Sequence, residues 1–150
     1  MNHLRKALHL PLLATALAAG ATSAQASPSV AIDSAVYVEH QAPGGTRRLE
    51  PARRLSPGDR VVTVVSWFRV GGDGSFVLTS PLPRSLAFQA SARTEEEVSV
   101  DGGRSWGRLG TLRRGGRFAT AEDVTHVRWR IDPTRAGRGS GHIAYSGIVR

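Results

Sequence analysis

The sequence predicts an all-β protein, and three observations lead to that prediction. Short apolar or alternating runs recur along residues 27–150, and clusters of Gly, Pro, Asp and Ser separate them. The length of 150 residues fits one ordinary domain. No internal repeat is visible, so the chain holds one copy of its unit. About seven to nine short strands in a domain of this size predict a two-sheet β-sandwich.

The first half of this domain alternates predicted strands and turns. Residues 36–38 form the first strand, and residues 47–55 form an Arg-rich edge strand that Pro51 interrupts. Ser56-Pro57-Gly58-Asp59 is a strong turn, because Pro presets φ and Gly supplies the bend. The strongest strand covers 61–69, which is dense in β-branched and aromatic residues.

The second half continues the same pattern, with further strands at 75–79, 85–90, 97–100, 124–131 and 142–149. Thr120 begins a single helical turn, as N-cap with Asp123 three residues later. Residues 137–141 are expected to be a flexible loop, because three of the five are Gly.

The alternation of strand residues predicts which side chains face the core. Core candidates are Val127, Trp129 and Ile131, and then Ile143, Tyr145 and Val149. Both faces of 61–69 are apolar, as expected for a central strand that is covered on both sides. Its second face, with Val62, Val64 and Phe68, would be covered either by residues 27–55 or by a partner chain.

The N-terminus has the pattern of a secretory signal peptide. Arg5 and Lys6 precede an apolar stretch from Leu8 to Ala21, and Ala24-Gln25-Ala26 supplies the small-x-small cleavage site. The apolar stretch is too short to span a bilayer well, which disfavours the alternative of a membrane anchor. We expect cleavage after Ala26, a mature β-sandwich domain of residues 27–150, no transmembrane segment in the mature chain, and a periplasmic or extracellular location.

The order of several motifs resembles a known family. Leu55-Ser56-Pro57-Gly58-Asp59, the strand after it, Ser80-Pro81-Leu82-Pro83, and the closing strands up to Val149 follow one another at suitable spacing. This order is similar to the bacterial surface repeat family catalogued as domain of unknown function eleven, over about residues 55–149. The sequence departs from that family's pattern at Arg69, Ser80 and Ser85. The resemblance implies an immunoglobulin-like sandwich on an exported protein and no catalytic residues.

One motif matches the Asp-box pattern, with Ser99, Asp101, Gly103 and Trp106 at the expected spacing. In such a hairpin the Asp accepts backbone N–H groups, the Gly takes positive φ and the Trp packs beneath. The pattern resembles the repeat of sialidase propellers, but one copy in so small a domain does not build a propeller. We expect a structural turn, with sugar binding as the alternative.

A basic stripe is expected on one face of 124–131, where His126, Arg128 and Arg130 alternate with core residues. Guanidinium groups suit phosphates, so the stripe is a candidate polyanion-binding surface. A second cluster comprises Arg47, Arg48, Arg53 and Arg54. Glu50 and Glu95 to Glu97 offer partners within the chain, which favours an ordinary solvated face. Specific recognition of nucleic acid is not expected, because no interleaved aromatic set appears.

Catalytic, metal and cofactor patterns are weak. The chain has no Cys, which excludes disulfides, thiolate zinc sites and a Cys nucleophile. Ser140 lies beside His142 but lacks the strand–turn–helix setting of an activated serine. The histidines at 40, 126 and 142 lack ligand spacing. We therefore expect no catalytic residues, metal or cofactor.

Three functions follow, in order of preference. The first is an exported, non-enzymatic module of the cell envelope with a structural or protein-interaction role. The second is a periplasmic module that binds a polyanion or glycan through the Arg-rich sheet face. The third is a small hydrolase, for which the sequence offers no convergent set of polar groups.

Overall fold

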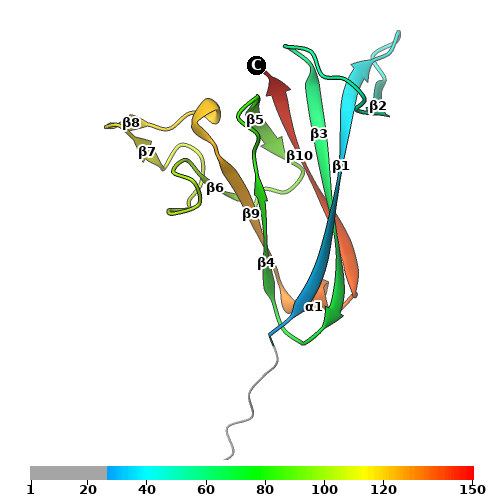
Figure 1. Ribbon diagram of the computed structural model, residues 1–150, viewed down its shortest axis with the longest axis vertical. Coiled ribbons are helices and arrows are strands. Elements are labelled where there is room, and N and C mark those ends of the chain that lie inside the picture. The colour runs from blue at the N-terminus through cyan, green and yellow to red at the C-terminus, as the bar shows by residue number, and fades with distance from the viewer. Residues whose placement is uncertain (1–26) are drawn as a thin grey trace, which may run out of the picture.

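The chain folds into two antiparallel sheets that face each other (Figure 1). The computed structural model describes residues 27–150. The larger sheet, sheet A, has the order β2-β1-β3-β10-β5 and comprises β1 (Ser29–Gln41), β2 (Arg47–Pro51), β3 (Arg60–Gly71), β5 (Leu86–Ser91) and β10 (Ser140–Val149). The smaller sheet, sheet B, has the order β4-β9-β6 and comprises β4 (Phe76–Pro81), β6 (Glu97–Ser99) and β9 (His126–Ile131). The predicted all-β sandwich is confirmed.

Three short elements complete the fold. A separate hairpin pairs β7 (Arg113–Arg114) with β8 (Arg117–Phe118) and projects from the sheet B side (Figure 1). A 3₁₀ turn, η1 (Ala121–Asp123), leads into β9, as the sequence predicted. The helix α1 (Pro133–Ala136) joins β9 to β10 at the end of sheet A that lies opposite the C-terminus (Figure 1).

The core lies between the two sheets, and the predicted inward faces of β9 and β10 are confirmed. Val127, Trp129 and Ile131 are buried, as are Ile143, Tyr145 and Val149. The ring centroids of Trp129 and Tyr145 lie 5.8 Å apart, and the Tyr145 hydroxyl lies 3.1 Å from the hydroxyl of Ser80. Aromatic pairs of this kind add to the stabilisation from buried area.

The expectation that residues 27–55 cover the second face of β3 is wrong. Val61, Val65 and Trp67 face sheet B and are buried, whereas Phe68 on the opposite face is 53% exposed. Residues 27–55 do not cover that face, because β1 pairs with β3 edge to edge and β2 pairs with β1. The N-terminal strands therefore widen sheet A instead of adding a layer.

The predicted loop at 137–141 is also shorter than expected. The strand β10 begins at Ser140, which pairs with Phe68, and Gly141 pairs with Trp67. A Cβ atom at Gly141 would lie 2.6 Å from Cζ2 of Trp67, so this glycine allows close packing of the indole ring. Only Gly139, with φ of 82°, serves the turn itself through left-handed backbone.

The predicted signal peptide, residues 1–26, and its cleavage site after Ala26 lie outside the described residues. Within residues 27–150, no helix combines the length and apolar character needed to cross a membrane.

Candidate functional site

The Asp101 carboxylate organises a tight turn between β6 and the 104–107 segment. Its Oδ1 accepts the backbone N–H groups of Arg104 at 3.0 Å and Ser105 at 2.9 Å. The hydroxyl of Ser105 donates to Oδ2 at 2.6 Å, and that of Ser99 donates to Oδ1 at 2.8 Å. The hydrogen bond from the Ser105 hydroxyl is the largest of several that hold the pKa of Asp101 well below its usual range. The carboxylate is thus occupied with holding the turn.

Trp106 closes this turn on the outer face of sheet B. Its indole N–H donates to the carbonyl oxygen of Gly103 at 2.9 Å, and Gly103 has a φ of 89°. The guanidinium carbon of Arg128 lies 4.5 Å from the centroid of a Trp106 ring, a cation–π contact. The His126 ring meets the Trp106 ring edge to face, with centroids 6.2 Å apart.

The basic stripe on β9 is partly neutralised by its own chain. Arg128 donates from Nε to Oε2 of Glu97 at 2.8 Å, in addition to stacking on Trp106. His126 Nδ1 lies 3.1 Å from Oγ1 of Thr125. Arg130 is exposed and makes no ion pair with any residue of the described chain. One of the three side chains therefore projects an unpaired charge.

A second ion pair fixes the β7–β8 hairpin against η1. Arg117 contacts both carboxylate oxygens of Asp123, at 2.7 and 2.9 Å, and the backbone N–H of Thr120 donates to the same carboxylate at 2.9 Å. The Arg117 guanidinium is the main reason why the pKa of Asp123 lies well below its usual range. The sequence indicated the Thr120–Asp123 turn but not Arg117, which contacts it from a different element.

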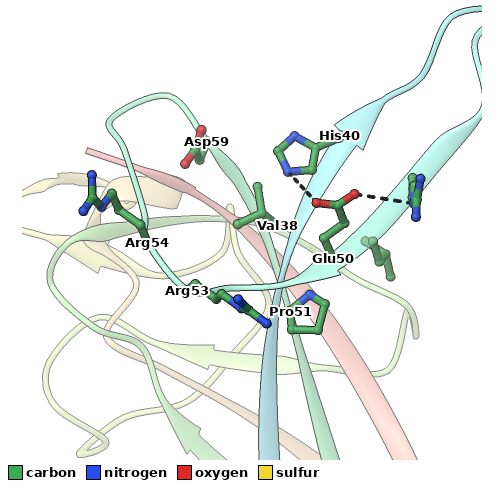
Figure 2. Close-up of a pocket in the computed structure, with 9 residues that line it drawn as sticks. Val38, His40, Glu50, Pro51, Arg53, Arg54 and Asp59 are labelled. Atoms are coloured by element: carbon green, nitrogen blue, oxygen red, sulfur yellow. Dashed lines mark ion pairs between the residues drawn. The ribbon is translucent and has the colours of Figure 1, made fainter.

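Three arginines of the second cluster, Arg48, Arg53 and Arg54, line a hollow at the β1–β2 end of sheet A. The fourth, Arg47, lies with its Nε 3.7 Å from Oε1 of Glu39. The hollow has a volume of about 600 Å³. Its lining residues, drawn in Figure 2, are Val38, His40, Arg48, Leu49, Glu50, Pro51, Arg53, Arg54 and Asp59. Glu50 lies 3.9 Å from Nε2 of His40 and 3.5 Å from Nε of Arg48. Asp59 accepts the backbone N–H of Ser56 at 2.8 Å. Arg53 and Arg54 form no ion pair within residues 27–150, so the hollow carries surplus positive charge.

A smaller cavity of about 180 Å³ lies at the opposite end of sheet A, between α1 and the start of β10. We call it the α1–β10 cavity. Its charged and aromatic lining consists of Trp67, Arg93, Arg135, Arg138 and His142, and the 140–141 backbone completes it. Sequence reasoning missed this cluster, because its arginines come from two segments that only the sheet topology brings together.

Ser140 and His142 both line this cavity, but the structure gives them no catalytic arrangement. No hydrogen bond between them is found in the part of the chain that the structure describes. Nor do residues 27–150 contain a group of three or more His, Asp or Glu side chains placed to hold a metal ion.

The geometry defines an all-β sandwich whose charged and concave features lie at the ends and outer faces of its sheets. Comparison of the chain with family models, with curated proteins and with solved structures gave no match. The resemblance to the bacterial surface repeat family thus depends on the order of motifs in the sequence alone.

Proposed function

We propose that this protein is an exported, non-enzymatic module of the cell envelope that binds a protein partner through β1 and β2. We call these two strands the overhang. The proposal rests on apolar side chains of β1 that lie on the same face of sheet A as the core residues of β3 but are not covered by sheet B.

Ile32 and Val36 are those side chains. Ile32 pairs with Trp67 and Val36 pairs with Thr63, and directly paired residues of an antiparallel sheet share a face. Trp67 and Thr63 are buried under sheet B, yet Ile32 is 54% exposed. Sheet A has five strands and sheet B has three, so the overhang extends past its cover. Ser34 lies between these two side chains on the same face, and exposed apolar side chains beside a core are typical of an interaction site.

The hollow in Figure 2 indicates the chemistry of the partner. Leu49 and Pro51 supply exposed apolar surface, while Arg53 and Arg54 supply positive charge that no ion pair of the described chain neutralises. Complementary charge speeds encounter and selects among partners. This combination favours an acidic segment that also carries apolar side chains.

The proposal that the protein is not an enzyme is supported by the structural roles of two carboxylates, Asp101 and Asp123. Asp101 and Asp123 are held ionised by hydrogen bonds that build a turn and a hairpin contact. A general acid or base at neutral pH needs a pKa nearer 7. Export is supported by the basic, apolar and small-x-small pattern of residues 1–26.

Site-specific crosslinking in cells tests the proposal. A photoreactive amino acid at Val36 or Leu49 should give a discrete adduct with an envelope protein, and Arg53→Glu/Arg54→Glu should reduce its yield. Val77, which is exposed on the outer face of sheet B, is the matched control position. Equal adducts at Val77, or adducts that do not respond to the charge reversal, would contradict the proposal.

Polyanion or glycan binding on the outer face of sheet B is the second candidate function. The observation that favours it is that Arg130 lies exposed on the strand that also presents the Arg128–Trp106 stack. Binding to polyphosphate should then weaken steeply with salt. An Arg128→Ala/Arg130→Ala variant that binds polyphosphate as well as the parent would exclude this function.

A further inference from the structure

The α1–β10 cavity combines an excess of positive charge with buried donors that have no acceptor. Four side-chain nitrogen or oxygen atoms in residues 27–150 are buried without a hydrogen-bond partner, and two of them, Nε1 of Trp67 and Nε of Arg93, belong to residues that line this cavity. Buried N–H groups without a partner are rare in folded proteins. Both residues line one small cavity, so a ligand bound there is a candidate acceptor for these donors.

The charge of the lining is of one sign. Arg93, Arg135 and Arg138 are the ionised side chains around the cavity, and no carboxylate lies among its lining residues in the described chain. Glu95 approaches Nε of Arg93 only to 4.0 Å, beyond hydrogen-bond distance. Asp132 accepts the backbone N–H of Arg135 and interacts electrostatically with the Arg135 side chain, but it forms no ion pair with it. An anion would meet two guanidinium groups, those of Arg135 and Arg138, that form no ion pair within residues 27–150.

The rigidity of the cavity wall distinguishes it from a chance surface cluster. Trp67 is 2% exposed and is packed edge to face against Phe76, with centroids 5.1 Å apart. Gly141 lies directly against its ring, since a Cβ there would be 2.9 Å from Nε1. The indole N–H therefore occupies a fixed position, and a fixed donor costs less to order when a ligand binds.

The size of the cavity restricts the ligand. Small-molecule sites commonly measure about 300–1,000 Å³, and about 180 Å³ is below that range. It corresponds to about six water molecules at their volume in the liquid. That space suits one compact oxyanion, not a sugar ring or a peptide. Guanidinium forks match the oxygens of phosphate in particular.

We propose that the α1–β10 cavity binds a phosphate group, either as free phosphate or as the terminal monoester of a larger molecule. Arg135 and Arg138 pair with the negative charge of the phosphate, and the indole N–H of Trp67 donates a hydrogen bond to one of its oxygens. This site lies at the opposite end of sheet A from the hollow in Figure 2, and its wall residue Trp67 pairs with Ile32 of β1. Separate variants therefore test the phosphate site and the arginines of that hollow.

The three indole N–H signals in a ¹⁵N NMR spectrum test the proposal with internal controls. Inorganic phosphate, titrated at constant ionic strength, should move the Trp67 signal along a saturable curve. The signals of Trp106 and Trp129 should stay in place, because these side chains already donate to Gly103 O and Ser91 Oγ. No saturable movement of the Trp67 signal, or equal movement of all three, would overturn the proposal.

Two variants locate the charge that holds the phosphate. Arg135→Gln/Arg138→Gln should weaken phosphate binding about tenfold or more, the factor expected from one charge-assisted hydrogen bond. Arg53→Gln/Arg54→Gln, in the hollow of Figure 2, should leave phosphate binding unchanged. Unaltered affinity in the first variant, with the fold verified by the unchanged spectrum elsewhere, would overturn the assignment.

The source of the phosphate group is distinguished by a vesicle assay. Co-sedimentation with phosphatidylcholine vesicles that contain phosphatidic acid, and not with phosphatidylcholine alone, supports a lipid headgroup if Arg135→Gln/Arg138→Gln abolishes it. Phosphate binding without vesicle binding supports a soluble source. Vesicle binding that the variant leaves intact counts against the cavity as the site.

Discussion

The outer face of sheet B and the α1–β10 cavity both collect arginines, but they use them differently. On that side of the molecule, Arg128 is engaged by Glu97 and Trp106 and Arg117 of β8 by Asp123, while Arg130 forms no ion pair in the described chain. Around the cavity, the side chains of Arg135 and Arg138 form no hydrogen bond within residues 27–150, and the indole N–H of Trp67 is also unpaired. Charge that is paired inside the chain stabilises the fold, while unpaired charge around a cavity is available to a ligand.

Both regions are supported by the same hydrophobic core. A core substitution is expected to give the largest loss of stability among the variants considered. Trp129→Ala should lower the free energy of unfolding by about 3–5 kcal/mol, because it removes a fully buried indole and leaves a cavity. Val77→Ala, at an exposed position on the neighbouring strand β4, should change it by less than about 0.5 kcal/mol. Urea denaturation measures both. A similar small loss for the two variants would mean that the sheets do not pack as described.

The wall of the cavity is expected to tolerate no added methyl group. Gly141→Ala places a Cβ within 2.6 Å of the Trp67 ring and should destabilise the protein by about 1–3 kcal/mol. Gly71→Ala is the matched control, since its Cβ meets nothing within 4 Å and its φ is not positive. Thermal unfolding of the two variants compares them directly. Equal melting temperatures would contradict the close contact between Gly141 and Trp67.

Acid should weaken the hydrogen bonds that Asp101 and Asp123 accept, and with them the stability of the fold. The pKa values of Asp101 and Asp123 are lowered in the folded protein, so their contribution is present above the unfolded value of about 3.9 and is lost as pH falls below it. Tm should therefore fall with pH below about 4. Asp123→Asn should lower Tm at neutral pH and flatten this dependence. A parallel Tm profile for the variant would contradict the role of the ion pair.

The smallest expected effect is the difference in the free energy of unfolding between substitution of a paired arginine and substitution of an unpaired one. Arg128→Gln should cost about 0.2–1 kcal/mol, the range of partly exposed ion pairs, because Arg128 loses Glu97. Arg138→Gln should change the free energy of unfolding by no more than about 0.5 kcal/mol, because its side chain forms no ion pair in the described chain. Chemical denaturation measures both values. A larger loss at Arg138 would show that its charge supports the fold.

The sequence predicted what depends on local pattern. The period of two placed Trp129 and Tyr145 in the core, and the spacing from Ser99 to Trp106 indicated a turn. It could not predict the α1–β10 cavity, because Arg93 and Arg138 lie on separate segments that meet only after β5 and β10 pair. The uncovered face of β3 was missed for a similar reason, since alternation does not reveal which strands face one another.

The binding site of an oxyanion can be located directly in crystals grown with selenate. Selenate mimics phosphate in shape and can be located by anomalous scattering. If unpaired charge beside a fixed N–H donor defines the binding site, the anomalous peak should lie in the α1–β10 cavity, within hydrogen-bond distance of Nε1 of Trp67 and of the Arg135 or Arg138 guanidinium. The outer face of sheet B around Arg128 should show none. A peak beside Arg128 with none in the cavity would contradict the assignment of the α1–β10 cavity as the oxyanion site.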